Sequence, residues 1–432
     1  MGAVLIAFLR GYYIILVLVK DAVPLPAPLI EVVKNYLIIK KAATIWYLTK
    51  KTGSATVLSI ATILGMLPMV ILSPFVGPMV DRWNKKGLLI FPDVFAACFA
   101  IILSVSGTVF HVFPLWLIFI SLLMRSCAQT FQMPTIQSVM PTMVPDKEIT
   151  RMNGQLGMVQ SANMIIAPAL GAFLFVFIPI EYLILLDVLG AIIGISILTW
   201  VQIPNNEKID QPMHVLHNTR LGIKQLTNNK GLWYITLIGA VFTLTYMPAA
   251  SMYPLMTMKY FQGTVSQAGL IEAIYSTGML IGGTIIGLFG KWQDRMKPVI
   301  IAFFLVGIPT GISGILPGNQ TGFLWFAALN IIEGIATPFF TTLLMAMIQQ
   351  SYPAEELGRI LGVLNSLLNL AGPIGLIFAG PLADVIGIER LFVIAGIGAA
   401  ICGVVAVLMP ITRQYDIRLH QKLAKLTEQP DK

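Results

Sequence analysis

Long apolar runs follow one another along most of the chain, separated by short polar connections. A helix that crosses a bilayer needs ~20 mainly apolar residues, and runs of that length recur after residue 53. Apolar and polar positions do not alternate within them, so the pattern predicts helices and not the strands of a membrane barrel. We place these helices at 54–80, 88–109, 112–133, 156–178, 180–202, 231–256, 266–290, 298–317, 321–348, 360–383 and 388–411.

The first 53 residues are less regular. Arg10 interrupts the first apolar run, and three prolines follow between residues 24 and 28. One helix is expected to cross within this segment, which gives twelve in all. The predicted fold class is therefore an all-α membrane protein with twelve transmembrane helices, and helices are counted below with that first one included.

Composition supports a protein dissolved in the bilayer. Hydrophobic residues make up 56% of the chain and charged residues 11%, with a mean hydropathy of +0.82. Soluble domains carry about 25% charged residues, so this chain cannot cover a water-facing surface. Its net charge of +8 does not indicate nucleic acid, because the basic residues are spread over short loops.

Basic residues gather in every second connection, and this bias orients membrane proteins with the basic loops inside the cell. The basic connections lie near residues 82–86, 147–151, 208–230, 291–297 and 359, and in the tail after residue 413. We therefore expect a multi-pass protein of the bacterial cell (inner) membrane with both termini in the cytoplasm.

A polar stretch divides the chain into two related halves. The expected units are 1–202 as an N-terminal six-helix half, 203–230 as a cytoplasmic linker, 231–412 as a C-terminal six-helix half and 413–432 as a cytoplasmic tail. The apolar positions of the linker fit either a short amphipathic helix on the inner membrane surface or a solvated segment.

A short repeat supports the duplication. Glu148 and Arg151 follow a proline and precede a glycine, and Glu356 and Arg359 recur with the same spacing in the second half. Both copies lie in a predicted cytoplasmic loop that enters a helix. Parallel repeats of six helices are typical of secondary transporters whose substrate site lies between the halves.

The loop after the second helix carries a longer motif. Gly77, Asp81, Arg82, Lys85 and Lys86 stand at the spacing Gly-x-x-x-Asp-Arg-x-x-basic-basic. Here Asp81 can face the positive N-terminal end of a neighbouring helix. The spacing resembles the signature of the major facilitator superfamily, and this resemblance implies two six-helix halves that work by alternating access.

A partial copy of the motif occupies the matching place in the second half, and it comprises Gly290, Asp294 and Arg295.

A second motif lies in the fifth helix. Ala167, Pro168 and Gly171 resemble the superfamily's antiporter motif, in which small residues flank a proline. Tight helix packing around a proline bend explains the same residues nearly as well.

Residues from about 45 to 415 resemble the Mef-like macrolide-efflux branch of the superfamily. The stretches that carry the resemblance begin at Trp46, Asp187, Ser313, Leu357 and Pro373. Membership would imply a drug:proton antiporter without a cofactor, monomeric by family default. The residues before Thr44 lack the branch's usual start, and we expect an altered first helix or a shifted reading frame there.

Proton-driven export needs an intramembrane group that takes up and releases a proton, and that group is normally a carboxylate. Glu333, well inside the tenth helix, is the first candidate, followed by Asp187 in the sixth and Glu272 in the eighth. Arg125 lies deep in the fourth helix. Protonation of a carboxylate that faces it would weaken their contact and could switch the protein between inward-open and outward-open states. Each of these residues also has a purely structural interpretation.

The substrate cavity of a drug exporter should be wide and apolar with few polar anchors. Candidates for its lining are Tyr246, Met247, Met252 and Tyr253 in the seventh helix and Asn330 in the tenth. Helix-to-helix packing is the alternative role for these side chains.

The function expected from these patterns is export of lipophilic drugs, macrolides in the first place, by exchange against protons. The partners are then a lipophilic small molecule, protons and membrane lipid, with no nucleic acid. Export of a siderophore or another metabolite is the alternative transport function, and a non-transporting or defective membrane protein is the alternative of another class. No metal site, nucleotide loop or enzyme motif stands out in the sequence.

Overall fold

The computed structural model describes residues 45–110, 113–143, 174, 178, 182, 184–200, 215–288, 294–352 and 354–427. These residues are helical apart from short connections, and none of them is in a strand. The crossing expected within residues 1–53 lies almost wholly outside this part of the chain, as does the expected helix at 156–178.

The first half contributes five described helices. The expected second helix is α3 (Ala55–Leu64) followed by α4 (Leu67–Arg82); the third is α5 (Lys85–Val109), the fourth α6 (Leu115–Met143) and the sixth α9 (Leu186–Trp200). A break between α3 and α4 was not expected. The Ser126 hydroxyl of α6 donates to the Gly65 carbonyl at 2.9 Å, and Pro68 is the second residue of the next helix. The contact from α6 satisfies a carbonyl at this break.

The second half contains all six expected crossings. The seventh is α11 (Lys230–Ser251), α12 (Tyr253–Leu255) and the π-turn η1 (Met256–Tyr260); then come α13 (Val265–Leu288), α14 (Met296–Ser313), α15 (Gln320–Ser351), α16 (Ala354–Ile386) and α17 (Ile388–Leu408). An amphipathic helix, α10 (Val215–Asn228), precedes them, and α18 (Pro410–Arg413) and α19 (Tyr415–Thr427) follow. The linker is thus helical over residues 215–228.

Small residues let these helices pack closely. A Cβ at Gly278 of α13 would lie 2.6 Å from the Ile331 carbonyl of α15, and one at Gly307 of α14 would lie 2.8 Å from the Gly396 carbonyl of α17. Backbones at that distance exclude any larger side chain, and such contacts are typical of helices packed in a bilayer.

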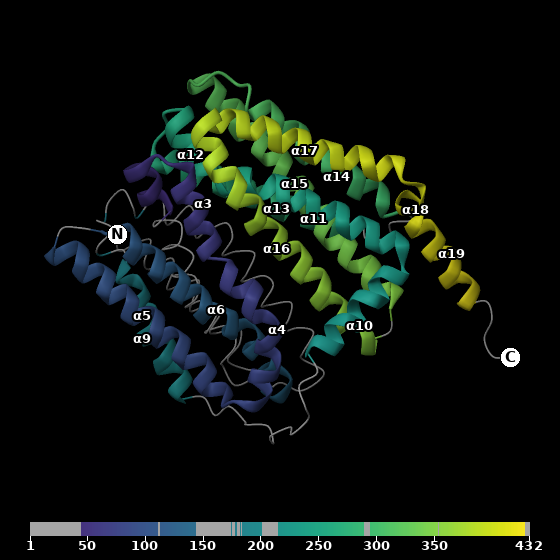
Figure 1. Ribbon diagram of the computed structural model, residues 1–432, viewed down its shortest axis with the longest axis horizontal. Helices are drawn as coiled ribbons and strands as arrows, with labels where there is room; N and C mark the ends of the chain where they lie inside the picture. The colour runs from purple at the N-terminus through teal and green to yellow at the C-terminus, as the bar shows by residue number, and fades with distance from the viewer. Residues whose placement is uncertain are drawn as a thin grey trace.

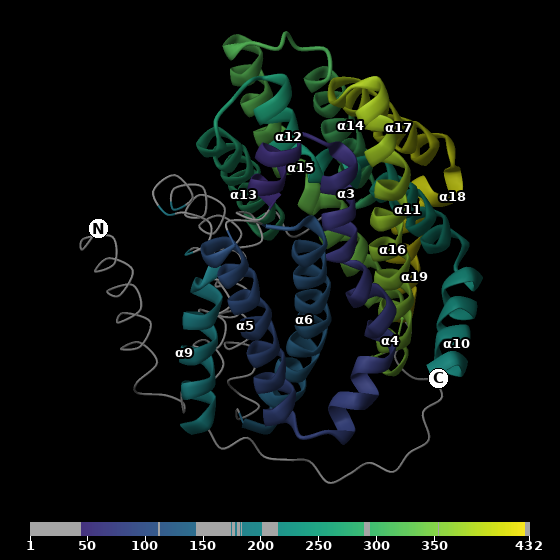
Figure 2. The same ribbon diagram turned by 60° about the vertical axis from the view of Figure 1, so that its left-hand side comes forward.

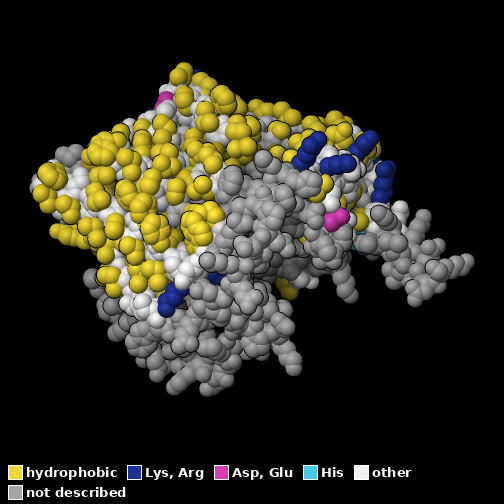
Figure 3. Space-filling view, turned by 60° about the horizontal axis from the view of Figure 1, so that its bottom comes forward, with side chains coloured by type: hydrophobic (Ala, Val, Ile, Leu, Met, Phe, Trp, Pro, Cys, Tyr) yellow, Lys and Arg dark blue, Asp and Glu magenta, His cyan; other side chains and the backbone are white. Residues whose placement is uncertain are grey.

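The surface of the bundle fits a bilayer. Eight helices of the described part are long and apolar enough to cross a membrane. Large apolar side chains point outward from them, such as Leu288 (77% exposed) and Phe91 (67%). Hydrophobic side chains cover most of the described surface in Figure 3, with Lys and Arg in small groups near its edges.

The two halves meet along α3 and α16. Figure 1 shows α3 and α4 running beside α16, with α11, α13, α14, α15 and α17 grouped on its other side. In Figure 2, α5, α6 and α9 lie on the side of α3 and α4 that faces away from α16, and α6 packs against α3 and α4. Because the start of α3 lies against the end of α16, these two helices are antiparallel.

Candidate proton-coupling site

A carboxyl group is buried inside the second half. Glu333 lies near the middle of α15, and its side chain is 1% exposed. Two hydrophobic clusters enclose this region, one built on Phe303 and Phe340 and the other on Phe326 and Phe392. The second cluster also includes Ala55 and Leu58 of α3. Glu333 is therefore removed from both lipid headgroups and bulk water.

Two tyrosines hold the carboxyl group. The Tyr253 hydroxyl donates to Glu333 Oε2 at 2.5 Å, and the Tyr246 hydroxyl donates to the same oxygen at 3.3 Å. The two hydroxyls are also 2.9 Å from each other. The tyrosines are seven residues apart, so two helical turns bring them to the same face on either side of Pro248. The other oxygen, Oε1, is buried and makes no hydrogen bond within the part of the chain that the structure describes.

A second layer of polar groups extends the site to α13. The Tyr275 hydroxyl lies 3.0 Å from Thr337 Oγ1, which donates to the Glu333 carbonyl at 2.8 Å. We call Tyr246, Tyr253, Tyr275, Glu333 and Thr337 the Glu333 cluster. It joins α11, α12, α13 and α15, so a change in its hydrogen bonds can alter how these helices pack.

The surroundings make charge costly at this position. The Tyr253 ring packs edge-on against Phe326 (centroids 5.8 Å) and tilted against Phe392 (5.9 Å). Among the described ion pairs, none involves Glu333. An ionised carboxylate in an apolar interior is expensive unless it is paired or fully hydrogen-bonded. The site therefore suits a group that exchanges a proton rather than one that stays charged.

The structure does not bring the other intramembrane candidates into this cluster. Arg125 is 6% exposed on α6, a helix that packs against α3, α4 and α5. Glu272 is half-buried two turns into α13, and Asp187 is the second residue of α9. That these residues take part in proton coupling stays a prediction.

The cavity candidates lie mostly in the packed interior. Tyr246 and Tyr253 belong to the Glu333 cluster, and Met252 and Asn330 are fully buried. Met247 lies near the first half: a Cβ at Gly372 of α16 would lie 3.1 Å from Met247 and 3.9 Å from Met66. Met252 and Tyr253 share a hydrophobic cluster with Ala55 and Leu58 of α3. A role of these residues in binding substrate remains a prediction.

The first copy of the loop motif forms the turn between α4 and α5. Gly77, Asp81 and Arg82 lie on the last turns of α4, and their side chains are outside the described residues. Lys85 is 2% exposed at the start of α5, and the Lys86 ammonium donates to the Thr199 carbonyl of α9 at 3.1 Å. Lys85 and Lys86 of the motif therefore take part in helix packing as well as carrying positive charge.

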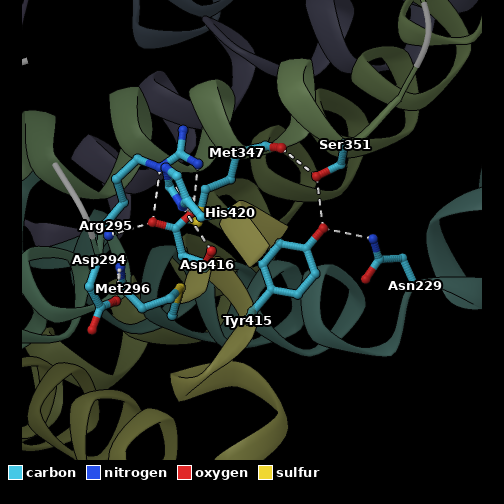
Figure 4. Close-up of polar contacts among 9 residues, drawn as sticks. All are labelled: Asn229, Asp294, Arg295, Met296, Met347, Ser351, Tyr415, Asp416 and His420. Atoms are coloured by element: carbon cyan, nitrogen blue, oxygen red, sulfur yellow. Dashed lines mark hydrogen bonds and ion pairs between the residues drawn. The ribbon is translucent and has the colours of Figure 1, made fainter. Parts of the chain in front are cut away.

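The second copy binds the C-terminal helix. Arg295 Nε lies 3.0 Å and Nη2 2.5 Å from the carboxylate of Asp416 in α19, and the Arg295 backbone N–H donates to the same carboxylate at 2.6 Å (Figure 4). Arg295 is 5% exposed and Asp416 is fully buried. Sequence reasoning missed Asp416, because it lies in a polar tail without a recognised motif. Asp294 instead faces Lys297, whose side chain is exposed.

Neighbouring contacts complete the docking of α19. The Tyr415 hydroxyl lies 2.7 Å from Ser351 Oγ and accepts from Asn229 Nδ2 at 2.8 Å (Figure 4). A Cβ at Gly231 would lie 2.3 Å from the Tyr415 ring. Burial raises the pKa of the Tyr415 hydroxyl, and it raises that of nearby Tyr352 to about 12. Both phenols therefore remain neutral donors at physiological pH.

Several predicted residues lie outside the described part of the chain. They are Gly290, the first repeat loop with Glu148 and Arg151, and the antiporter-like Ala167, Pro168 and Gly171. Of the second repeat loop, Glu356 is half-buried in the first turn of α16, where Arg359 follows. Among the described residues no group of acidic, histidine and cysteine side chains could hold a metal ion.

Comparison with solved structures places the fold. A POT family transporter in complex with a thioalcohol-conjugated peptide superposes with a TM-score of 0.71 at 14% identity, covering 88% of this chain and 94% of that one. A bacterial homolog of the human lysosomal transporter Spinster gives 0.65 at 12% identity, covering 92% and 96%. Both are transporters, and with the helical, strand-free described part of this chain they confirm the predicted all-α membrane fold, whereas the count of twelve helices stays a prediction.

Sequence comparison is more specific. Macrolide efflux protein A of Streptococcus pyogenes is 34% identical over 382 residues, which cover 88% of this chain and 94% of that protein. The multidrug efflux pump Tap of Mycolicibacterium fortuitum is 24% identical over 86% of this chain and 91% of that protein. The family profile of the Major Facilitator Superfamily matches residues 41–261 and 235–423. The chain therefore belongs to the major facilitator superfamily, in the group that includes macrolide efflux protein A.

Proposed function

We propose that this protein exports lipophilic drugs of the macrolide class out of the cell in exchange for protons. The similarity to macrolide efflux protein A and to the Tap pump supports the drug class. The observation that carries the proton coupling is the burial of Glu333, at 1% exposure, on two tyrosine hydroxyls.

Protonation changes what the Glu333 cluster can do. An ionised carboxylate accepts hydrogen bonds only, so both tyrosine hydroxyls can donate to it. A protonated carboxyl group has a donor of its own, and its hydroxyl needs an acceptor. With the proton on Oε2, at least one tyrosine must reverse its role or move away. With the proton on Oε1, that new hydroxyl must find an acceptor among the neighbouring groups. Each step of proton uptake or release would rearrange bonds between α15 and the α11–α12 segment.

The helix that carries the tyrosines is well suited to respond. Pro248 removes one backbone hydrogen bond from α11, the helix restarts at Tyr253, and η1 continues as a π-turn. Breaks of this kind concentrate bending at one place. We propose that bending of this segment couples the protonation of Glu333 to the change between the outward-facing and inward-facing states.

The orientation belongs to the same proposal. The basic loops lie on the cytoplasmic side, which places both chain termini in the cytoplasm and the start of α3 at the outer surface. A single chain acts alone, and it binds a lipophilic substrate, a proton and surrounding lipid without a cofactor.

The proposal is tested by the accumulation of labelled erythromycin in a pump-deficient bacterial host. Cells that express the chain should accumulate less drug than cells with an empty vector, and a protonophore should abolish the difference. The control variant Glu389→Gln removes a carboxyl group at the start of α17, outside the Glu333 cluster, and should export normally. Equal accumulation in expressing and empty cells, with the protein present in the membrane, would refute macrolide export.

A further inference from the structure

We propose that Asp384 is a latch that holds the outer ends of the two halves together and so keeps the transport pathway closed on that side. The inference rests on the alternating access of the proposed function. Asp384 lies in the last turn of α16, and its partners all belong to the start of α3, so every contact crosses between the halves.

The carboxylate makes three hydrogen bonds to the first residues of α3. Oδ2 accepts from the Ser54 hydroxyl at 2.7 Å and from the Thr56 backbone N–H at 2.9 Å, and Oδ1 accepts from the Ala55 backbone N–H at 2.7 Å. The first N–H groups of a helix have no partner within it. Ser54, the N-cap of α3, accepts from the Val57 N–H at 3.3 Å. Asp384 supplies the acceptors for the N–H groups of Ala55 and Thr56.

Charge strengthens the contact. A carboxylate at a helix N-terminus faces the positive end of the helix dipole, and hydrogen bonds to an ionised group are stronger than neutral ones. Asp384 is nevertheless solvent-exposed, so water can replace each bond when the halves separate. An interaction that is favourable but exposed is suited to a latch that must open in every cycle.

The packing around Asp384 points to the same role. One turn earlier, a Cβ at Gly380 would lie 2.5 Å from Ser59 Oγ and 3.1 Å from the Thr56 Cα of α3. A second contact joins the same ends: the Lys259 ammonium, in η1, donates to the Gly53 carbonyl at 2.8 Å. Two elements of the second half therefore hold residues 53–56 of the first.

The sequence contains the same pattern twice. Gly380-Pro381-Leu-Ala-Asp384 ends α16, and Gly77-Pro78-Met-Val-Asp81 ends α4. The helices α3 and α4 together run antiparallel to α16, so the two patterns lie at opposite ends of the interface between the halves. The loop motif with Asp81 would serve the cytoplasmic end, and Asp384 would be its counterpart at the outer end.

The test measures the outer opening directly. Spin labels are attached at Lys50→Cys and Arg390→Cys, two exposed outer positions on different halves, after Cys98, Cys127 and Cys402 are replaced by Ser. Distance distributions of the full-length protein in lipid nanodiscs are recorded by pulsed electron paramagnetic resonance. We expect Asp384→Asn to raise the ratio of the long-distance to the short-distance population about tenfold, which corresponds to about 1.4 kcal/mol.

Two further variants isolate the charge. Asp384→Glu keeps the carboxylate and should restore most of the short-distance population. Glu389→Gln removes a carboxyl group five residues away at the same end and should leave the distribution unchanged. An Asp384→Asn distribution that matches that of the parent protein would overturn the latch, provided that the variant elutes as a folded protein.

Failure of the latch can be told from failure of the proposed function, because the distance measurement needs neither drug nor proton gradient. Proton-dependent efflux combined with unchanged distances would refute the latch alone. A shift in distance combined with no efflux would support the latch and refute macrolide export alone.

Discussion

Removal of the Asp416 carboxylate should destabilise the second half strongly. In Asp416→Ala, the guanidinium and the backbone N–H of Arg295 would lose all their hydrogen bonds to Asp416. The Arg295 side chain, which is 5% exposed in the parent protein, would stay buried without them. Breaking a buried pair by removing one partner costs about 3–5 kcal/mol, because the remaining charge is left uncompensated. We expect a loss of that size in the free energy of unfolding, measured by equilibrium unfolding in mixed micelles.

A neighbouring carboxylate provides the matched control. Asp294 belongs to the same motif copy, but its partner Lys297 is 75% exposed and 3.5 Å away. An exposed pair contributes about 0–1 kcal/mol, so Asp294→Ala should cost little. Replacing both buried partners, with Arg295→Met and Asp416→Leu, should recover most of the lost stability. Equal costs for Asp416→Ala and Asp294→Ala would refute the claim that the buried pair anchors α19.

Two other substitutions test the site and the interface. Tyr253→Phe removes the shorter hydrogen bond to Glu333, and a hydrogen bond to a charged group contributes about 1.5–3 kcal/mol, so we expect proton-driven efflux to be at least tenfold slower. Tyr246→Phe removes the longer contact of 3.3 Å and should slow efflux less. Equal effects of the two substitutions would contradict the assigned geometry. Gly380→Ala inserts a methyl group against Ser59 and should open the outer end in the spin-label measurement as Asp384→Asn does; an unchanged distance would show that the helices can separate there without cost.

The membrane helices could be predicted from the sequence because each is encoded locally, by an apolar run of the required length. The break between α3 and α4 could not, since it depends on Ser126, 61 residues from Gly65. The sequence also named Glu333, Tyr246 and Tyr253 but assigned the tyrosines to the substrate cavity. Their contact joins residues 80 and 87 positions apart, and only the packing of helices brings them together.

The two missed carboxylates have different explanations. Asp416 lies in a short polar helix, and nothing near it in the sequence indicates that it would be buried against Arg295. Asp384 follows directly after the predicted helix at 360–383, so it lies outside the spans that supply the intramembrane carboxylates named from the sequence. A signal was present in this case, because the Gly-Pro-x-x-Asp pattern of Asp81 recurs there. Internal comparison of the two halves can find such positions, whereas hydropathy cannot.

The central claim is that Glu333 carries the coupled proton, and transport in proteoliposomes tests it most directly. Purified protein is reconstituted in liposomes with an acidic lumen, and uptake of labelled erythromycin is measured above that of protein-free liposomes. The wild-type protein should concentrate the drug while the pH gradient lasts, and Glu333→Gln should still exchange labelled for unlabelled drug but lose concentrative uptake. Gradient-driven uptake by Glu333→Gln at the wild-type rate would contradict the account.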